Sequence, residues 1–236
     1  MASAAQDPGG PAQLGIPVRI GIVFDLDGTL IDSRVDIANA ANHALAEHGF
    51  ATRSVSEIAS FVGDGARALL ERAARIAPGA TELEPLLDTF LGYYAAHPTD
   101  HTLLIIGAHE ALSRLAHLPL ALCTNKPRAI TDKVIANLRF PAQFAALVAG
   151  GDLPKNKPDP LPLLHIARAL SLAPSQLVMV GDGPQDILCA KAAGARSVGI
   201  EGGMQGAEKL LGTNPDVVLR SLAELPNVIE QWQNGV

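Results

Sequence analysis

The chain has 236 residues, 48% of them hydrophobic, and a formal net charge of −6 at pH 7. This length and apolar content can bury a sizeable core, so they exclude a disordered chain. The acidic balance, with no block rich in Lys and Arg, excludes the electrostatic footprint of a protein that binds nucleic acid or an anionic membrane. No apolar run approaches the roughly 18 residues of a membrane helix. Residues 1–10 lack the pattern of a signal peptide, so we expect a cytoplasmic protein.

The first hundred residues divide into three segments. Residues 1–17 are rich in Ala, Gly and Pro without apolar periodicity, so we predict a flexible tail. An apolar strand follows at 18–24. From 33 to 103 the pattern is helical, with apolar stripes at helical spacing: Ala38, Ala41, Leu45; Leu69, Leu70, Ala73; and Leu83, Leu86, Leu87, Phe90, Tyr94.

From about residue 104 the chain alternates helices with short apolar strands. We predict helices at 107–116, 127–138, 160–170, 185–193 and 221–232, and strands at 118–123, 145–148, 177–180, 197–200 and 217–219. This alternation is typical of a parallel sheet covered on both faces. The predicted fold is therefore α/β, with a doubly wound, Rossmann-like core made of 18–32 and 104–236 and a helical domain inserted at 33–103.

Two carboxylates follow the first strand. Asp25 and Asp27 stand one residue apart before a Gly28-Thr29 turn, and strand side chains alternate between faces, so both can reach one site. Close carboxylates repel each other unless a proton or a cation lies between them. An ordinary turn that favours Asp and Gly is the alternative interpretation, and it is open at this point.

Polar side chains also follow the later strands, at the sheet edge where ligands bind in such folds. Thr124 and Asn125 precede a helix and can hold a phosphate there, or simply cap the helix. Lys157 lies in a proline-rich loop, where its charge can reach a phosphate or stay solvated. Asp182 and Asp186 follow the fourth of these strands.

Four acids are thus predicted at one edge of the sheet: Asp25, Asp27, Asp182 and Asp186. Four carboxylates in one place are strongly destabilising without a cation. Oxygen ligands without His or Cys favour Mg²⁺ over zinc. The sequence therefore predicts Mg²⁺ as the cofactor.

These motifs, in this order, resemble the signatures of the haloacid dehalogenase-like phosphohydrolases: Asp25-Leu26-Asp27-Gly28-Thr29, Thr124-Asn125, Lys157-Pro158, and Gly181-Asp182 through Asp186. The resemblance implies that Asp25 is the nucleophile and Asp27 the acid/base. It implies phosphate binding by Thr124, Asn125 and Lys157. It implies Mg²⁺ bound by Asp25, the backbone carbonyl of Asp27 and Asp182. Asp186 would support the metal or Lys157, and 33–103 would be the mobile cap of the family.

Within that superfamily the chain is most similar to the phosphoglycolate phosphatases. The similarity rests on Asp32-Ser33, the stretch 61–73, the run 123–127 and Lys157-Pro158-Asp159-Pro160. It implies Mg²⁺-dependent hydrolysis of 2-phosphoglycolate through an aspartyl-phosphate. The chain departs from the usual pattern at Ile105-Ile106-Gly107, at Gly202-Gly203-Met204, and at Gly183, where a Ser or Thr is frequent.

One residue of the inserted domain is a candidate for substrate recognition. Arg67 follows a Gly-Asp-Gly turn, and a guanidinium suits two-point binding of a carboxylate. We hypothesise that Arg67 faces the site and pairs with a substrate carboxylate. The alternative is a solvated Arg on a helix.

Other activities stay open at this stage. The same aspartyl-phosphate can be passed to a sugar, so a phosphatase or phosphomutase acting on a sugar phosphate is an alternative. A non-catalytic phosphate-binding module is a more distant one. We expect the partner to be a small phosphorylated metabolite, not nucleic acid or a membrane, and the chain to act as a monomer or homodimer.

Overall fold

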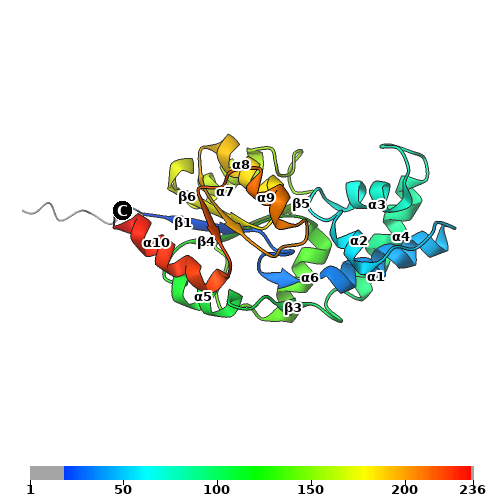
Figure 1. The fold of residues 1–236 in the computed structure, drawn as a ribbon, viewed down its shortest axis with the longest axis horizontal. Helices are drawn as coiled ribbons and strands as arrows, with labels where there is room; N and C mark the ends of the chain where they lie inside the picture. The colour runs from blue at the N-terminus through cyan, green and yellow to red at the C-terminus, as the bar shows by residue number, and fades with distance from the viewer. Residues whose placement is uncertain (1–18, 235–236) are drawn as a thin grey trace, which may run out of the picture.

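The structure is a computed structural model that describes residues 19–234. An α/β core forms one end of the molecule and a group of four helices the other, as Figure 1 shows. The tail predicted at 1–17 lies outside the described residues. Within 19–234, no helix combines the length and the apolar character needed to cross a membrane.

The core is built on a six-stranded sheet in which each neighbouring pair of strands is parallel. Its spatial order is β5 (Ala146–Gly150), β4 (Leu120–Pro127), β1 (Gly21–Phe24), β6 (Leu177–Gly181), β7 (Arg196–Ile200) and β8 (Val217–Leu219). The first strand therefore lies in the middle, between β4 and β6. This order confirms the predicted doubly wound parallel sheet.

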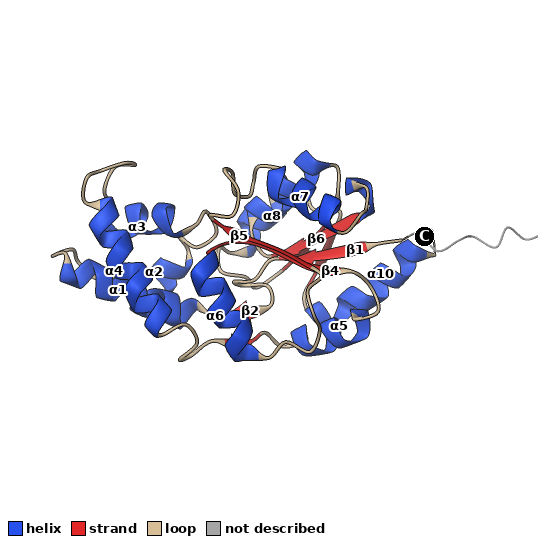
Figure 2. Cartoon of the chain, turned by 180° about the vertical axis from the view of Figure 1, so that it is seen from behind, coloured by secondary structure: helices blue, strands red, loops and turns tan. Residues whose placement is uncertain are grey.

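Successive residues of β1 pack against opposite layers of helices. Ile22 and Phe24 belong to one apolar cluster and Val23 to another. The first cluster includes residues of α5 (Ala108–Leu115), α6 (Arg128–Leu138) and α10 (Leu225–Gln233), and the second includes residues of α7 (Leu161–Ala169) and α8 (Pro184–Ala193). Figure 2 shows these helices on the two sides of the sheet. Because both faces are covered, the strand is apolar along its whole length.

The helical insertion consists of α1 (Arg34–Glu47), α2 (Val55–Ala59), α3 (Ala66–Ala74) and α4 (Leu83–Ala96). Its interior is formed by the apolar stripes of these helices, with Leu45, Leu70, Leu86 and Phe90 buried. The same apolar cluster continues into the first face of the core. The insertion therefore packs against the core instead of standing apart from it.

The two connections between the insertion and the core are held together by a short antiparallel pair. β2 (Ile31–Asp32) pairs with β3 (Leu103–Leu104). Beside this pair, the Asp36 carboxylate accepts hydrogen bonds from the His101 backbone N–H at 3.0 Å and from the Thr102 hydroxyl at 2.6 Å. The sequence did not predict the pair, because a strand of two residues is too short to show periodicity.

Several element boundaries differ from the prediction. β4 runs on through Pro127 and α6 begins at Arg128, so Thr124 and Asn125 lie in the strand and do not cap the helix. The helix predicted at 221–232 begins as the 3₁₀ turn η2 (Leu222–Glu224), and η1 (Pro174–Gln176) and α9 (Ala207–Leu211) were not predicted. These elements are too short to show an apolar period.

Candidate active site

The carboxyl ends of three adjacent strands and one loop bring the predicted residues together. Asp25 follows β1 directly, Thr124 lies near the end of β4, and Asp182 follows β6. Lys157 comes from the segment between β5 and α7. Because β4 and β6 both pair with β1, the ends of these strands lie side by side.

Lys157 is a buried lysine that pairs with two buried carboxylates, those of Asp25 and Asp186. Its ammonium donates to Asp25 Oδ1 at 2.7 Å, to Asp186 Oδ1 at 2.6 Å and to the Cys123 carbonyl at 2.6 Å. These contacts occupy the three donors that a lysine has. Burial disfavours the charged ammonium, but Asp186 and Asp25 outweigh this effect, so the pKa of Lys157 lies well above its usual value. Lys157 is therefore a fixed positive charge beside Asp25.

Three buried carboxylates, from Asp25, Asp182 and Asp186, offer oxygen atoms within 4.8 Å of one another. Burial raises the pKa of Asp25 well above its usual range, and the Asp186 and Asp182 charges add to this while Lys157 opposes it. Burial, and then the Asp186 charge, raises the pKa of Asp182 to about 7. The single positive charge of Lys157 does not neutralise the negative charge of three ionised carboxylates. A donor set made only of oxygen fits a hard cation such as Mg²⁺.

Asp182 is oriented by its neighbours. Its Oδ1 accepts from the Thr29 hydroxyl at 3.0 Å, and its Oδ2 accepts from the Met204 backbone N–H at 2.9 Å. Gly28 has a φ of +90°, and a Cβ there or at Gly203 would collide with the Asp182 carboxylate. Glycine at these two positions lets the backbone approach the acid closely.

Asp27 lies on a separate side of the site. Its carboxylate accepts from the Ser33 hydroxyl at 2.5 Å and from the Lys126 ammonium at 2.9 Å and 3.2 Å. It does not belong to the group of three carboxylates. The strand β1 ends at Phe24, so the two acids do not follow continuous strand geometry. The two acids that stand one residue apart in the sequence are therefore paired with two different lysines, Asp25 with Lys157 and Asp27 with Lys126.

The second of these lysines, Lys126, connects the core to the helical insertion. Its ammonium also donates to the Tyr94 hydroxyl of α4 and lies 4.4 Å from the centre of the Tyr94 ring. Burial raises the pKa of Tyr94 to about 12, so the phenol keeps its proton. Burial alone would lower the pKa of Lys126, but Asp27 outweighs it and the pKa lies above its usual value. Lys126 is therefore a buried cation that contacts Asp27 of the core and Tyr94 of the insertion.

Thr124 and Asn125 have different positions. Thr124 is buried and lines the cavity. The Asn125 amide instead accepts from the Lys157 N–H at 3.0 Å and donates to the Lys157 carbonyl at 2.8 Å and to the Gly63 carbonyl of the insertion at 2.7 Å. Asn125 thus fixes the backbone of Lys157 and contacts the insertion, although its side chain also lines the cavity.

Arg67 does not reach the site. Its guanidinium makes a two-point contact with Glu84 at 2.5 Å and 2.9 Å, and its side chain is 57% exposed. Its neighbours Gly65 and Ala66 line the cavity, but Arg67 itself does not. The reason is the turn of α3, which directs the residue after Ala66 toward α4 and solvent. The structure therefore differs from the hypothesis that Arg67 faces the substrate.

A cavity of about 40 Å³ lies between the core and the insertion. Its polar wall includes Asp25, Asp27, Thr124 and Lys126, and its apolar wall includes Ile37, Val62, Leu69 and Phe90. At roughly 10–15 Å³ for each water, this volume holds a few waters or the organic part of a small ligand.

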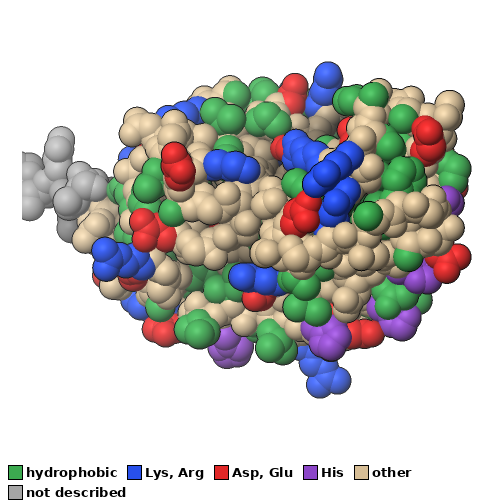
Figure 3. All heavy atoms as spheres, turned by 45° about the vertical axis from the view of Figure 1, so that its right-hand side comes forward, with side chains coloured by type: hydrophobic (Ala, Val, Ile, Leu, Met, Phe, Trp, Pro, Cys, Tyr) green, Lys and Arg blue, Asp and Glu red, His purple; other side chains and the backbone are tan. Residues whose placement is uncertain are grey.

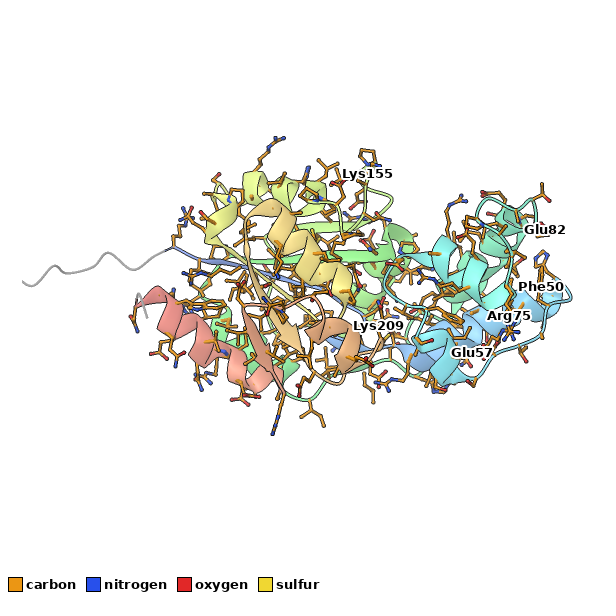
Figure 4. The ribbon with its side chains drawn as sticks, turned by 45° about the horizontal axis from the view of Figure 1, so that its top comes forward. Phe50, Glu57, Arg75, Glu82, Lys155 and Lys209 are labelled. Carbon is orange, nitrogen blue, oxygen red and sulfur yellow. The ribbon has the colours of Figure 1, made fainter. Side chains whose placement is uncertain are left out.

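A second hollow lies at the boundary between insertion and core. It is lined by Asp64 and Arg72 of the insertion and by Gln205 and Lys209 of the core, among others. Lys209 is labelled in Figure 4, and the face drawn in Figure 3 carries a group of basic side chains around an acidic one. Gln205 donates to Gln185, which lines the first cavity, at 3.0 Å. Arg72 is paired with Asp64 within this hollow, so Lys209 is the basic group there that favours the approach of an anion.

Gly183, one of the departures from the expected pattern noted in the sequence, packs closely against a neighbouring side chain. A Cβ at this position would collide with the Gln185 side chain. Gln185 is buried and lines the cavity. The absence of a side chain at 183 therefore leaves room for the amide of Gln185.

Comparison with known families decides the class. Residues 22–200 match the model of the haloacid dehalogenase-like hydrolases. The chain belongs to this family. The match spans the helical insertion and the first five strands of the sheet in chain order, and it includes the buried acids and lysines Asp25, Asp27, Lys126, Lys157, Asp182 and Asp186.

Relatives within the haloacid dehalogenase-like hydrolases are similar over most of the chain. The phosphoglycolate phosphatase of Chromobacterium violaceum is 37% identical over 89% of this chain and 96% of its own length, and that of Pectobacterium atrosepticum is 36% identical over 87% and 90%. A crystal structure of a predicted phosphoglycolate phosphatase from Haemophilus somnus superposes with a TM-score of 0.83 at 28% identity, covering 91% of this chain and 99% of that one. The chain is a phosphatase, a phosphoric monoester hydrolase of this family.

Lys126 and Tyr94 are among the site residues that were not assigned from the sequence. Lys126 stands in the Thr124-Asn125-Lys126-Pro127 motif, directly after two assigned residues, so its place at the strand end was a usable signal. Tyr94 was read only as part of an apolar stripe. A buried Tyr usually has a partner for its hydroxyl, but the sequence does not say which partner.

Proposed function

We propose that the chain hydrolyses 2-phosphoglycolate to glycolate and phosphate, with Asp25 as the nucleophile. The observation that carries the proposal is the 2.7 Å contact of Lys157 with Asp25, in a wall of the cavity that Asp27 and Thr124 also line. The substrate is supported by the relatives named phosphoglycolate phosphatase, which match most of the chain.

In the first step the Asp25 carboxylate attacks phosphorus, which forms an aspartyl-phosphate and releases glycolate. Both reactants are anionic, so positive charge is needed beside the phosphate oxygens. Lys157 supplies that charge from behind Asp25, and the Thr124 hydroxyl is a donor that lines the cavity. Most of the rate enhancement then comes from positioning and electrostatics.

Asp27 acts as the acid and then as the base. It gives a proton to the oxygen of the leaving glycolate, and it removes one from the water that hydrolyses the aspartyl-phosphate. Ser33 and Lys126 hold its carboxylate in place, in the cavity that Asp25 shares. Asp25 is paired with Lys157 and Asp27 with Lys126, and these different surroundings support different roles for the two acids.

We propose Mg²⁺ for the group of three carboxylates. Asp25 and Asp182 would hold it together with the backbone carbonyl of Asp27, and Asp186 would keep Lys157 in place. The support is the set of oxygen donors within 4.8 Å and the raised pKa of Asp25 and Asp182, which a cation would reverse. When bound, Mg²⁺ supplies positive charge for the phosphate oxygens.

We propose that 33–103 is a cap that excludes bulk water, over a catalytic core of 18–32 and 104–236. Tyr94, Leu69 and Phe90 of the insertion line the cavity, which supports this role. Closure over the substrate also selects its size.

The proposal is tested by measuring phosphate release with Mg²⁺ from 2-phosphoglycolate, ethyl phosphate and several sugar phosphates. We expect the highest kcat/KM with 2-phosphoglycolate. A higher value with a sugar phosphate would contradict the substrate and favour the sugar-phosphate alternative. A phosphorylated sugar product instead of free phosphate would indicate a phosphomutase. No release from any ester would indicate a non-catalytic module.

A further inference from the structure

Lys126 is the only cationic side chain among the described residues that line the cavity. Its side chain is 2% exposed, while that of Arg67, the other candidate for binding a substrate anion, is 57% exposed and paired with Glu84. Lys157 is committed to Asp25, Asp186 and a backbone carbonyl. An anionic group on the organic part of a substrate would therefore meet Lys126.

The contacts of Lys126 leave room for a ligand. An ammonium has three N–H donors. Its partners are one carboxylate, Asp27, whose two oxygens can share a donor, and one hydroxyl, Tyr94. A third donor is then available to a bound molecule. The ammonium of lysine acts as a point charge, so it can bind a carboxylate without the planar geometry that the guanidinium of arginine requires.

The distance between Lys126 and Asp27 determines where the carboxylate of the substrate must lie. In the proposed reaction, which this inference takes as its basis, Asp27 reaches the oxygen that leaves with glycolate. Lys126 Nζ lies 2.9 Å from Asp27 Oδ1, so the ammonium is beside that leaving oxygen. In 2-phosphoglycolate one methylene separates the ester oxygen from the carboxylate. A longer acid would place its carboxylate farther from the ester oxygen, and therefore farther from this ammonium.

We propose that Lys126 binds the substrate carboxylate and thereby selects phosphate esters of short 2-hydroxy acids. Tyr94 holds the ammonium from the insertion, through its hydroxyl and its ring. Recognition of the carboxylate thus needs a residue of the core and a residue of the insertion together. The phosphate end of the substrate, in contrast, is bound by the core.

The test compares kcat/KM for 2-phosphoglycolate with kcat/KM for ethyl phosphate, which keeps the ester and lacks the carboxylate. The ratio of the two values cancels any general effect of Lys126 on Asp27. In Lys126→Met and Lys126→Gln we expect the ratio to fall by about 10- to 100-fold, as for a lost hydrogen bond between charged groups. Lys155→Met, which removes an exposed lysine on the outer side of the core (Figure 4), is the matched control and keeps the ratio.

If the ratio of kcat/KM for 2-phosphoglycolate to kcat/KM for ethyl phosphate is unchanged in a folded Lys126 variant, the inference is overturned. It is also overturned if this ratio falls in Arg67→Ala. If neither Lys126 variant folds, the native enzyme still decides. We expect it to prefer 2-phosphoglycolate over the isosteric amide and over the ester of 3-hydroxypropionate, and equal rates with these would overturn the inference. Failure of the native enzyme to hydrolyse 2-phosphoglycolate would instead overturn the proposed function, which separates the two failures.

Discussion

Two buried lysines are each paired with one acid of the Asp25 and Asp27 pair, and both acids line the cavity. Lys157 lies 2.7 Å from Asp25, and its other contacts also come from the core. Lys126 lies 2.9 Å from Asp27, but its remaining partner, Tyr94, belongs to the insertion. We therefore propose that the core binds the phosphate beside Asp25, which we call the phosphate end, while core and insertion together form the selecting end beside Asp27 and Lys126.

The largest effect that separates the two ends is expected from Lys157→Met. The variant leaves Asp25 and Asp186 without their shared cation, so we expect kcat to fall by about 10³-fold or more with every ester, since this charge stabilises the transition state. We also expect a loss of stability of about 3–5 kcal/mol, as for a broken buried ion pair. Phosphate release and chemical denaturation measure the two effects. A loss confined to carboxylate-bearing esters would contradict the assignment of Lys157 to the phosphate end.

Asp27→Asn tests the other acid. A proton donor matters most when the leaving group is a poor one, so we expect kcat to fall by about 10²- to 10⁴-fold with 2-phosphoglycolate. With p-nitrophenyl phosphate, whose leaving group needs no proton, the release of p-nitrophenol in the first turnover should be almost unchanged. Rapid-mixing absorbance measures this burst. An equal loss with both esters would argue against general acid catalysis by Asp27.

Metal binding should stabilise the phosphate end and depend on Asp182. Without metal, the Asp182 pKa is raised from about 3.9 to about 7, so the free energy of unfolding falls as pH rises between these values. Mg²⁺ binds the ionised carboxylate and should raise the Tm more at pH 8 than at pH 5. The Asp182→Asn variant should lose this gain. Thermal melts with and without Mg²⁺ measure it, and a gain of the same size in the variant would contradict the metal site.

The smallest effect is expected at Arg67. The Arg67→Ala variant removes an exposed ion pair with Glu84, so we expect kcat/KM for 2-phosphoglycolate to change by less than about twofold. Glu84→Ala breaks the same pair from the other side and is the matched control. A large loss of preference for the acidic ester in Arg67→Ala alone would restore Arg67 as the residue that binds the substrate carboxylate.

The phosphate end could be predicted from the sequence because each of its residues directly follows an apolar strand or lies in a loop at the same sheet edge. Asp25, Thr124 and Asp182 are placed by strand order alone, and the parallel pairing of β1 with β4 and β6 brings them together. The sequence predicted four carboxylates at this edge, and the structure separates Asp27 from the other three, which depends on side-chain packing that the sequence does not show.

The selecting end could not be predicted in the same way. The contact of Lys126 with Tyr94 joins residues 32 positions apart across a helix packing that no local pattern encodes. The position of Arg67 depends on where α3 turns its side chains, and the sequence shows only that a Gly-Asp-Gly turn precedes it. The β2 and β3 pair, which holds the insertion to the core, is likewise formed by strands too short to recognise.

The nucleophilic role of Asp25 is the central claim, and trapping the phosphorylated enzyme tests it most directly. The native enzyme and Asp27→Asn are mixed with p-nitrophenyl phosphate and Mg²⁺, quenched in acid, digested and analysed by mass spectrometry. We expect the mass of one phosphoryl group on the peptide that contains Asp25, more of it in Asp27→Asn because water attack is slowed, and none in Asp25→Asn. A phosphoryl group on another residue, or undiminished phosphate release by Asp25→Asn, would contradict the mechanism.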